Sequence, residues 1–173
     1  MLLVAATERE LVGLDGAVCG VGPVDAAAAT ARLLAERRPR ALLHVGLAGA
    51  LGFGGPALVL GTEARYCDAD PPLVAAVAHP DRDLLEAARR ALPDARTCPI
   101  GTSARVGGTT GCDVEAMEGF AVLRACELAG VAALELRVTA NEIREPDRGR
   151  WRFDEALALL AGRLPPLLEA LRA

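Results

Sequence analysis

The chain has 173 residues, of which 52% are hydrophobic and 24% are charged, and its formal net charge is −4. This length predicts one domain, residues 1–173, with a core large enough to fold without a disulfide or metal staple. The acidic balance, the 3% aromatic content and the lack of a basic run argue against a nucleic-acid partner.

Short apolar runs alternate with helix-forming runs along the chain. In chain order, the sequence predicts a strand at Leu2–Ala6, a helix at Val24–Glu36, a strand at Ala41–Val45, extended segments at 57–60 and 64–66, a helix at Asp81–Ala91, a strand at Thr97–Ile100, a helix at Glu115–Leu128, a strand at Ala132–Val138 and a helix at Phe153–Leu171 that is bent or interrupted near Pro165 and Pro166. Short strands that are apolar on both faces indicate a largely parallel sheet covered by helices. We therefore expect an α/β fold, a three-layer sandwich with a mixed, largely parallel sheet flanked by helices.

The apolar runs also bear on location. None of them approaches the ~20 residues that span a bilayer, and the N-terminal segment turns acidic at Glu8 without a basic targeting region. The 5 cysteines are scattered singly, as in proteins of a reducing compartment. We expect a cytoplasmic protein without a membrane partner.

Residue counts exclude several kinds of chemistry. All 19 basic residues are Arg, so neither a lysine Schiff base nor a phosphate-binding loop of the GK[ST] type can form. Ser103 is the only Ser and does not lie in a GxSxG turn. With 2 His and no CxxC pair, a zinc site is not expected, and we predict no metal and no cofactor.

Polar residues follow several predicted strands. Glu10 comes shortly after the first strand, Ala48 and Gly49 lie in a glycine-rich segment after the second, and Asn141 follows the strand at 132–138. Ligands of open α/β sheets bind where strands end, so these residues are candidates for one pocket. Each of them alone fits a solvated loop residue equally well.

The segment 113–120 carries two acidic residues, Glu115 and Glu118, that we expect on one face of the predicted helix. A stabilising interaction with the helix dipole explains Glu115. It explains Glu118 less well, because Met117 and Phe120 beside it are typical of a core. A buried carboxylate needs polar partners, and sugar hydroxyls are one such set.

Several segments together resemble the purine nucleoside phosphorylase and nucleosidase superfamily. The similar segments, in order, are Ala6–Leu11, Gly20–Ala27, Val45–Ala50, Leu60–Asp70, Glu115–Gly119, Leu136–Glu142 and Phe153–Leu157. The resemblance implies cleavage of a ribose–purine bond, with a small-molecule purine nucleoside as partner and a homodimer or higher homo-oligomer as the assembly.

The resemblance also assigns roles near the sugar. Glu118 resembles the residue that binds the ribose hydroxyls, with Met117 packed beside the sugar, and Glu10 resembles the base that activates water. A carboxylate accepts a proton from water but repels phosphate, so hydrolysis is favoured over phosphorolysis. Leu47 departs from the serine that adenine nucleosidases often carry, and it stands beside the candidate binding residues Ala48 and Gly49.

The base-recognition residues point to a 6-oxopurine. Relatives that act on 6-aminopurines carry Asp where this chain has Asn141, whose amide offers one donor and one acceptor. Its NH2 group can donate to O6 of the base, and its oxygen can accept from protonated N7. Arg105 and Val106 are expected to touch the purine, although adenine-specific relatives carry an aromatic residue in place of Arg105.

Within the superfamily, this combination resembles the futalosine hydrolases, whose substrate carries a carboxyphenyl ketone on an inosine-like nucleoside. The segment 142–154 fits that tail: Trp151 and Phe153 could pack on its ring, and Arg144, Arg148 or Arg150 could pair with its carboxylate. The alternatives are a methylthioadenosine/adenosylhomocysteine nucleosidase, a purine nucleoside phosphorylase and a nucleoside-binding relative without turnover.

Overall fold

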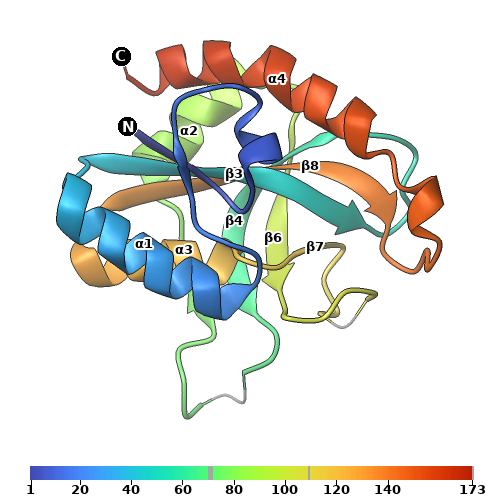
Figure 1. The fold of residues 1–173 in the computed structure, drawn as a ribbon, viewed down its shortest axis with the longest axis horizontal. Helices are drawn as coiled ribbons and strands as arrows, with labels where there is room; N and C mark the ends of the chain where they lie inside the picture. Colours follow the sequence, from blue (N-terminus) through green and yellow to red (C-terminus); the bar gives the residue numbers. More distant parts are fainter. Residues whose placement is uncertain (70–71, 109, 173) are drawn as a thin grey trace.

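The computed structural model describes residues 1–69, 72–108 and 110–172, so Asp70 of the family-like segment 60–70 lies outside it (Figure 1). Strands and helices alternate along the described chain. In order they are β1 (Leu2–Ala5), the 3-10 helix η1 (Glu8–Leu11), β2 (Ala17–Val18), α1 (Pro23–Arg37), β3 (Ala41–Ala50), β4 (Leu58–Tyr66), β5 (Val77–Ala78), α2 (Arg82–Ala91), β6 (Arg96–Thr102), β7 (Val114–Ala116), α3 (Gly119–Ala129), β8 (Ala132–Glu142), η2 (Arg148–Arg150) and α4 (Phe153–Ala170).

The strands form one mixed sheet that curls into a ring. Going round the ring, β3 pairs with β8, β8 with β4, β4 with β6, β6 with β7, and β7 again with β3. The strands β1 and β2 extend the sheet from β3, and β5 extends it from β4. Most neighbouring strands run parallel, as the sequence predicts.

Helices cover the sheet on two sides (Figure 1). Leu43, Leu136 and Leu160 belong to the apolar core under α2 and α4, whereas Leu42, Leu123 and Cys126 belong to the core under α1 and α3. Alternate residues of β3 and β8 point to opposite cores, as side chains of a strand must. This arrangement is the predicted three-layer sandwich.

The predicted helix at 115–128 is wrong at its start. Val114–Ala116 forms β7, and α3 begins at Gly119 after the N-cap residue Glu118. Glu115 therefore lies on a strand and does not share a helical face with Glu118. The predicted interruption of the last helix is also absent, because α4 runs through Pro165 and Pro166.

The strands β3 and β8 are longer than the sequence patterns predict, and they continue into the region of the candidate site. β3 ends at Ala50 and β8 at Glu142, with a bulge in β3 between Ala48 and Gly49. Among the described residues, no helix is both long and apolar enough to cross a membrane.

Candidate active site

A cavity of about 520 Å³ opens at the carboxyl ends of β1, β3 and β8. The predicted site residues that line it are Glu10, Leu47, Ala48, Gly49, Arg105, Val106, Met117, Glu118, Asn141, Arg148, Trp151 and Phe153. They come from segments far apart in the sequence and meet around one hollow. Among the described residues, no group of three or more His, Cys, Asp or Glu side chains could hold a metal ion.

Glu10 is held rigidly on one wall of the cavity. It is 8% exposed and lies in the short helix η1, which follows β1 directly. Its Oε2 accepts hydrogen bonds from the backbone N–H and the hydroxyl of Thr7, at 3.0 and 2.8 Å, and its Oε1 accepts from the N–H of Leu47 at 2.9 Å. Because all three neighbours are donors, the carboxylate is fixed in place and acts only as an acceptor.

Glu118 faces the same cavity from the start of α3. It is 4% exposed, and its Oε1 accepts a hydrogen bond from the N–H of Gly22 at 3.0 Å. Gly22 can present that N–H because it takes a φ of 92°, which favours glycine. A second buried carboxylate therefore stands near Glu10.

Arg137 is a candidate site residue that the sequence reasoning missed. It is fully buried, and its Nη2 lies 3.4 Å from Oε2 of Glu118. Its Nη1 has no hydrogen-bond partner among the described residues. A Cβ on Gly46 would collide with both this Nη1, which is buried, and Oε1 of Glu10, so the two groups lie close together over Gly46. Burial opposes the charge of Arg137, but the carboxylates of Glu135, Glu118 and Glu10 outweigh it and keep the pKa of Arg137 above its ordinary value.

Asn141 lies on the other side of the β3 bulge. It is 6% exposed and pairs with Gly49 in the sheet register. Its Nδ2 donates to the backbone carbonyl of Glu142 at 2.9 Å, which leaves its Oδ1 and one N–H for a ligand. A Cβ on Gly49 would approach Nδ2 to 3.2 Å, so glycine provides the room for this amide.

Glu115 holds a loop. Its Oε1 accepts from the N–H groups of Gly107 and Gly108 at 3.1 and 2.9 Å, and its Oε2 accepts from the hydroxyl of Thr110 at 3.3 Å. The same loop carries Arg105 and Val106 to the cavity. The carboxylate that was expected beside Glu118 therefore shapes the cavity wall.

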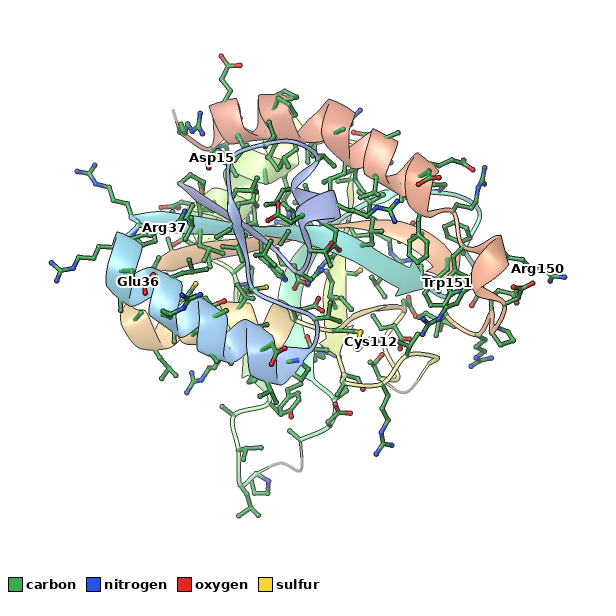
Figure 2. All side chains as sticks on the ribbon, in the orientation of Figure 1. Asp15, Glu36, Arg37, Cys112, Arg150 and Trp151 are labelled. Atoms are coloured by element: carbon green, nitrogen blue, oxygen red, sulfur yellow. The ribbon has the colours of Figure 1, made fainter. Side chains whose placement is uncertain are left out.

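The far end of the cavity is aromatic and basic. Trp151 and Phe153 meet edge to face, with ring centroids 5.4 Å apart, and the Arg148 guanidinium lies 5.5 Å from the centroid of the Trp151 ring. Arg150 extends outward (Figure 2) and pairs with Glu145 at 3.2 Å. Of the three predicted arginines, the cavity lining includes Arg148 but neither Arg144 nor Arg150.

His44 contacts Arg137, and we expect it to make stability depend on pH. Burial and the Arg137 charge lower the pKa of His44 well below its ordinary value of 6.5. Below that value the unfolded chain binds a proton that the folded chain refuses, so stability falls as the pH falls. The slope reaches about 1.4 kcal/mol per pH unit.

We expect the melting temperature of the wild type to drop by roughly 4–8 °C more than that of His44→Gln between about pH 6.5 and pH 5. Burial also raises the pKa of Glu135, which has the opposite effect above its ordinary value of 4.5, but Glu135 is present in both proteins. Thermal unfolding of the two proteins at both pH values measures the difference. Equal drops would show that folding does not lower the pKa of His44.

Residues 16–171 match the family model of the phosphorylase superfamily. A futalosine hydrolase of Streptomyces coelicolor is 35% identical over 191 aligned positions, which cover 91% of this chain and 81% of that protein.

Solved structures share the fold. The native structure of futalosine hydrolase of Helicobacter pylori strain 26695 has a TM-score of 0.85 at 15% identity and covers 96% of both chains. A 5′-methylthioadenosine/S-adenosylhomocysteine nucleosidase from Neisseria meningitidis, in complex with methylthio-immucillin-A, has a TM-score of 0.81 at 22% identity, over 99% of this chain and 97% of that chain. The chain therefore belongs to the phosphorylase superfamily, as a relative of the futalosine hydrolases.

Proposed function

We propose that the protein hydrolyses the N-glycosidic bond of a 6-oxopurine nucleoside, and that this nucleoside is futalosine. The products are hypoxanthine and dehypoxanthine futalosine, which places the reaction in menaquinone biosynthesis. The support comes from the 35% identical futalosine hydrolase and from a cavity that combines Glu10, Glu118 and Asn141 with an aromatic, basic end.

The observation that supports hydrolysis over phosphorolysis is the charge at the end of the cavity lined by Glu10 and Glu118, which we call the sugar end. Two buried carboxylates, Glu10 and Glu118, face it against the single buried guanidinium of Arg137. This excess of negative charge stabilises a sugar that becomes positive in the transition state. It also disfavours phosphate as the nucleophile, because like charges at short range repel in a poorly solvated site.

The reaction follows from these positions. Water binds between Glu10 and Nη1 of Arg137, and its oxygen attacks C1′ of the ribose while Glu10 accepts the proton. The bond between C1′ and N9 breaks, its electron pair moves into the purine, and N7 takes a proton from solvent water. Asn141 then accepts from N7–H and donates its remaining N–H to O6, while Glu118 accepts from the ribose hydroxyls.

The test is an assay of base release. Wild-type protein is incubated with futalosine, inosine or methylthioadenosine, each with and without phosphate. We expect hypoxanthine from futalosine at the same rate in both conditions. Release only with phosphate would establish a phosphorylase, fastest release from methylthioadenosine would establish an adenine-type nucleosidase, and no release at all would indicate a binding protein.

Arg148 lies at the aromatic, basic end of the cavity, where we propose that the carboxyphenyl tail of futalosine binds. Replacement of Arg148 by Ala should raise KM for futalosine by roughly 10–100-fold, because a hydrogen bond to a charged group contributes about 1.5–3 kcal/mol. KM for inosine, which lacks the carboxylate, should not change. Steady-state kinetics with both substrates measure the two effects.

The matched control is Arg150→Ala. Arg150 is two residues away, has the same charge and is outside the cavity lining. Equal effects of the two substitutions, or an equal effect of Arg148→Ala on both substrates, would remove Arg148 from carboxylate recognition.

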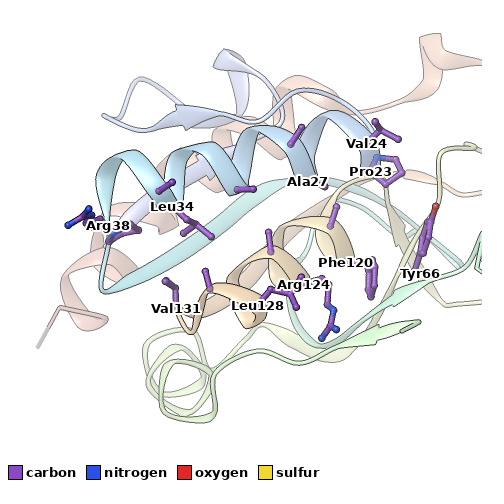
Figure 3. Close-up of a pocket in the computed structure, with 17 residues that line it drawn as sticks. Pro23, Val24, Ala27, Leu34, Arg38, Tyr66, Phe120, Arg124, Leu128 and Val131 are labelled. Atoms are coloured by element: carbon purple, nitrogen blue, oxygen red, sulfur yellow. The ribbon is translucent and has the colours of Figure 1, made fainter. Parts of the chain in front are cut away.

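We also propose that the protein is a homodimer. A second hollow of about 950 Å³ lies between α1 and α3 and is lined mainly by alanine and other apolar residues (Figure 3). Val24 and Leu128 line this hollow and are 77% and 73% exposed. A contiguous apolar surface of this kind is unusual on a monomer and is typical of a contact with another protein. A second copy of the same face would cover both.

Leu128→Glu should convert the dimer to a monomer, because it places a charge in the centre of the buried contact. Ala161→Glu is the control, since it adds the same charge to the exposed face of α4, across the sheet. Light scattering after size-exclusion chromatography measures the mass of each protein. A monomeric wild type would contradict the proposal.

We further propose a reducing, cytoplasmic location. The 5 cysteines are free thiols, which supports it.

A further inference from the structure

The two central strands place a buried polar cluster directly beneath the sugar end of the cavity. In the parallel pairing of β3 and β8, His44 is opposite Glu135 and Gly46 is opposite Arg137. Alternate residues of a strand share a face, so these four positions lie together on one side of the sheet. His44, Glu135 and Arg137 are all fully buried.

Hydrogen bonds determine the protonation of His44. Its Nδ1 lies 3.1 Å from the carbonyl oxygen of Val4, which can only accept, so Nδ1 carries the hydrogen and donates it. Nε2 is then a lone-pair acceptor, and it faces Nη2 of Arg137 at 2.5 Å. A neutral imidazole therefore holds one nitrogen of the guanidinium.

Glu135 holds a second nitrogen. Its Oε1 accepts from Nε of Arg137 at 2.8 Å. With Nε and Nη2 both engaged, the planar guanidinium cannot rotate, and its third nitrogen, Nη1, is directed to the space beside Gly46 and Oε1 of Glu10. The orientation of Nη1 thus depends on His44 and Glu135, together with the ion pair between Nη2 and Glu118.

The fold makes room for this cluster at the expense of packing. A Cβ on Gly119 would collide with the carboxylate of Glu135, and a Cβ on Gly46 would collide with Arg137. Well-packed apolar residues in place of a buried ion pair are often neutral or stabilising. Stability alone therefore does not account for a fully buried His, Glu and Arg at this place.

We propose that His44 and Glu135 are positioning residues that hold the Arg137 guanidinium so that Nη1 donates to the attacking water beside Glu10. This inference rests on the proposed hydrolysis, because it assigns the water to the space between Glu10 and Arg137. Neither residue touches the substrate, and both act through Arg137.

Two pairs of variants test the inference. His44→Leu and Glu135→Met remove the acceptors of Nη2 and Nε, whereas His44→Gln and Glu135→Gln retain an oxygen near each position. We expect the first pair to lower kcat by roughly 10–100-fold, because a small misplacement near the reacting atoms has effects of this size. KM for futalosine should stay nearly constant, and the glutamine variants should recover most of the loss.

A double-mutant cycle separates positioning from general damage. Arg137→Lys keeps the charge but loses the planar fork that His44 and Glu135 hold, so adding His44→Leu to it should lower kcat no further. Leu134→Val is the control for weakened packing: Leu134 precedes Glu135 on β8 and faces the opposite core. It should lower the melting temperature without changing kcat.

The outcomes are distinct. Wild-type kcat in His44→Leu and Glu135→Met, or the same loss from His44→Leu with and without Arg137→Lys, would overturn the inference. Should His44→Leu not fold, Glu135→Met and Glu135→Gln carry the same comparison. A wild-type protein that releases no base from futalosine without phosphate would overturn the proposed function itself, and the inference with it.

Discussion

Replacement of Glu10 by Gln should lower kcat for futalosine hydrolysis by roughly 100- to 10,000-fold, the range that general bases contribute. The amide cannot accept the proton of the attacking water. Its NH2 group would also face a donor in either orientation, because one oxygen of Glu10 accepts from Thr7 and the other from Leu47. Steady-state kinetics with and without the substitution measure the loss.

Glu8→Gln is the matched control, since Glu8 lies in the same short helix and is exposed. It should leave kcat unchanged. Hypoxanthine binding should persist in Glu10→Gln, because Asn141 recognises the base and Glu10 does not. A rate near that of the wild type in Glu10→Gln would remove Glu10 from the mechanism.

Replacement of Asn141 by Asp should shift the substrate preference from 6-oxopurine toward 6-aminopurine nucleosides by roughly 10–100-fold, because a mispaired buried polar group costs about 1–3 kcal/mol. The amide of Asn141 donates to the carbonyl of Glu142. An ionised Asp would repel that carbonyl and O6 of the base alike, and it would accept from an exocyclic amine. The ratio of kcat/KM for inosine and adenosine measures the shift.

Asn141→Leu provides the comparison. It removes donor and acceptor together and should lower kcat/KM for both nucleosides without favouring either. An unchanged substrate ratio in Asn141→Asp would mean that the amide does not recognise the base.

Patterns within single elements predicted most of the fold. The alternation of apolar and helix-forming runs located α1, α2, α4 and the central strands, since their core-facing residues recur at regular spacing. The two-residue strands β2 and β5 have no such pattern. They exist because β1 and β4 provide partners for them.

The error at Glu115 has a tertiary cause. The run from Glu115 to Phe120 contains good helix formers, and propensity alone favours a helix there. The structure places Val114–Ala116 between β3 and β6, where pairing with two strands outweighs local preference. No feature of the segment itself reveals those partners.

The site residues likewise divide into those that local sequence patterns indicate and those that depend on tertiary contacts. Glu10, Glu118 and Asn141 were candidates because each lies beside a recognisable local pattern. Arg137 was not, although the alternation of Glu135 and Arg137 with apolar residues in the segment Leu134–Val138 is an available signal. Its partnership with His44 depends on the register of β3 and β8, which are about 90 residues apart in the chain and which the sequence alone does not align.

The ring of strands also affects self-association through the sheet. Within the described chain, the strands at its two open margins are β2 and β5, and each is only two residues long. Unpaired backbone N–H and C=O groups at such a margin are what a foreign strand needs as a template. Because β2 and β5 expose so few unpaired backbone groups, conversion into edge-to-edge aggregates or fibrils first requires the five-stranded ring to break open.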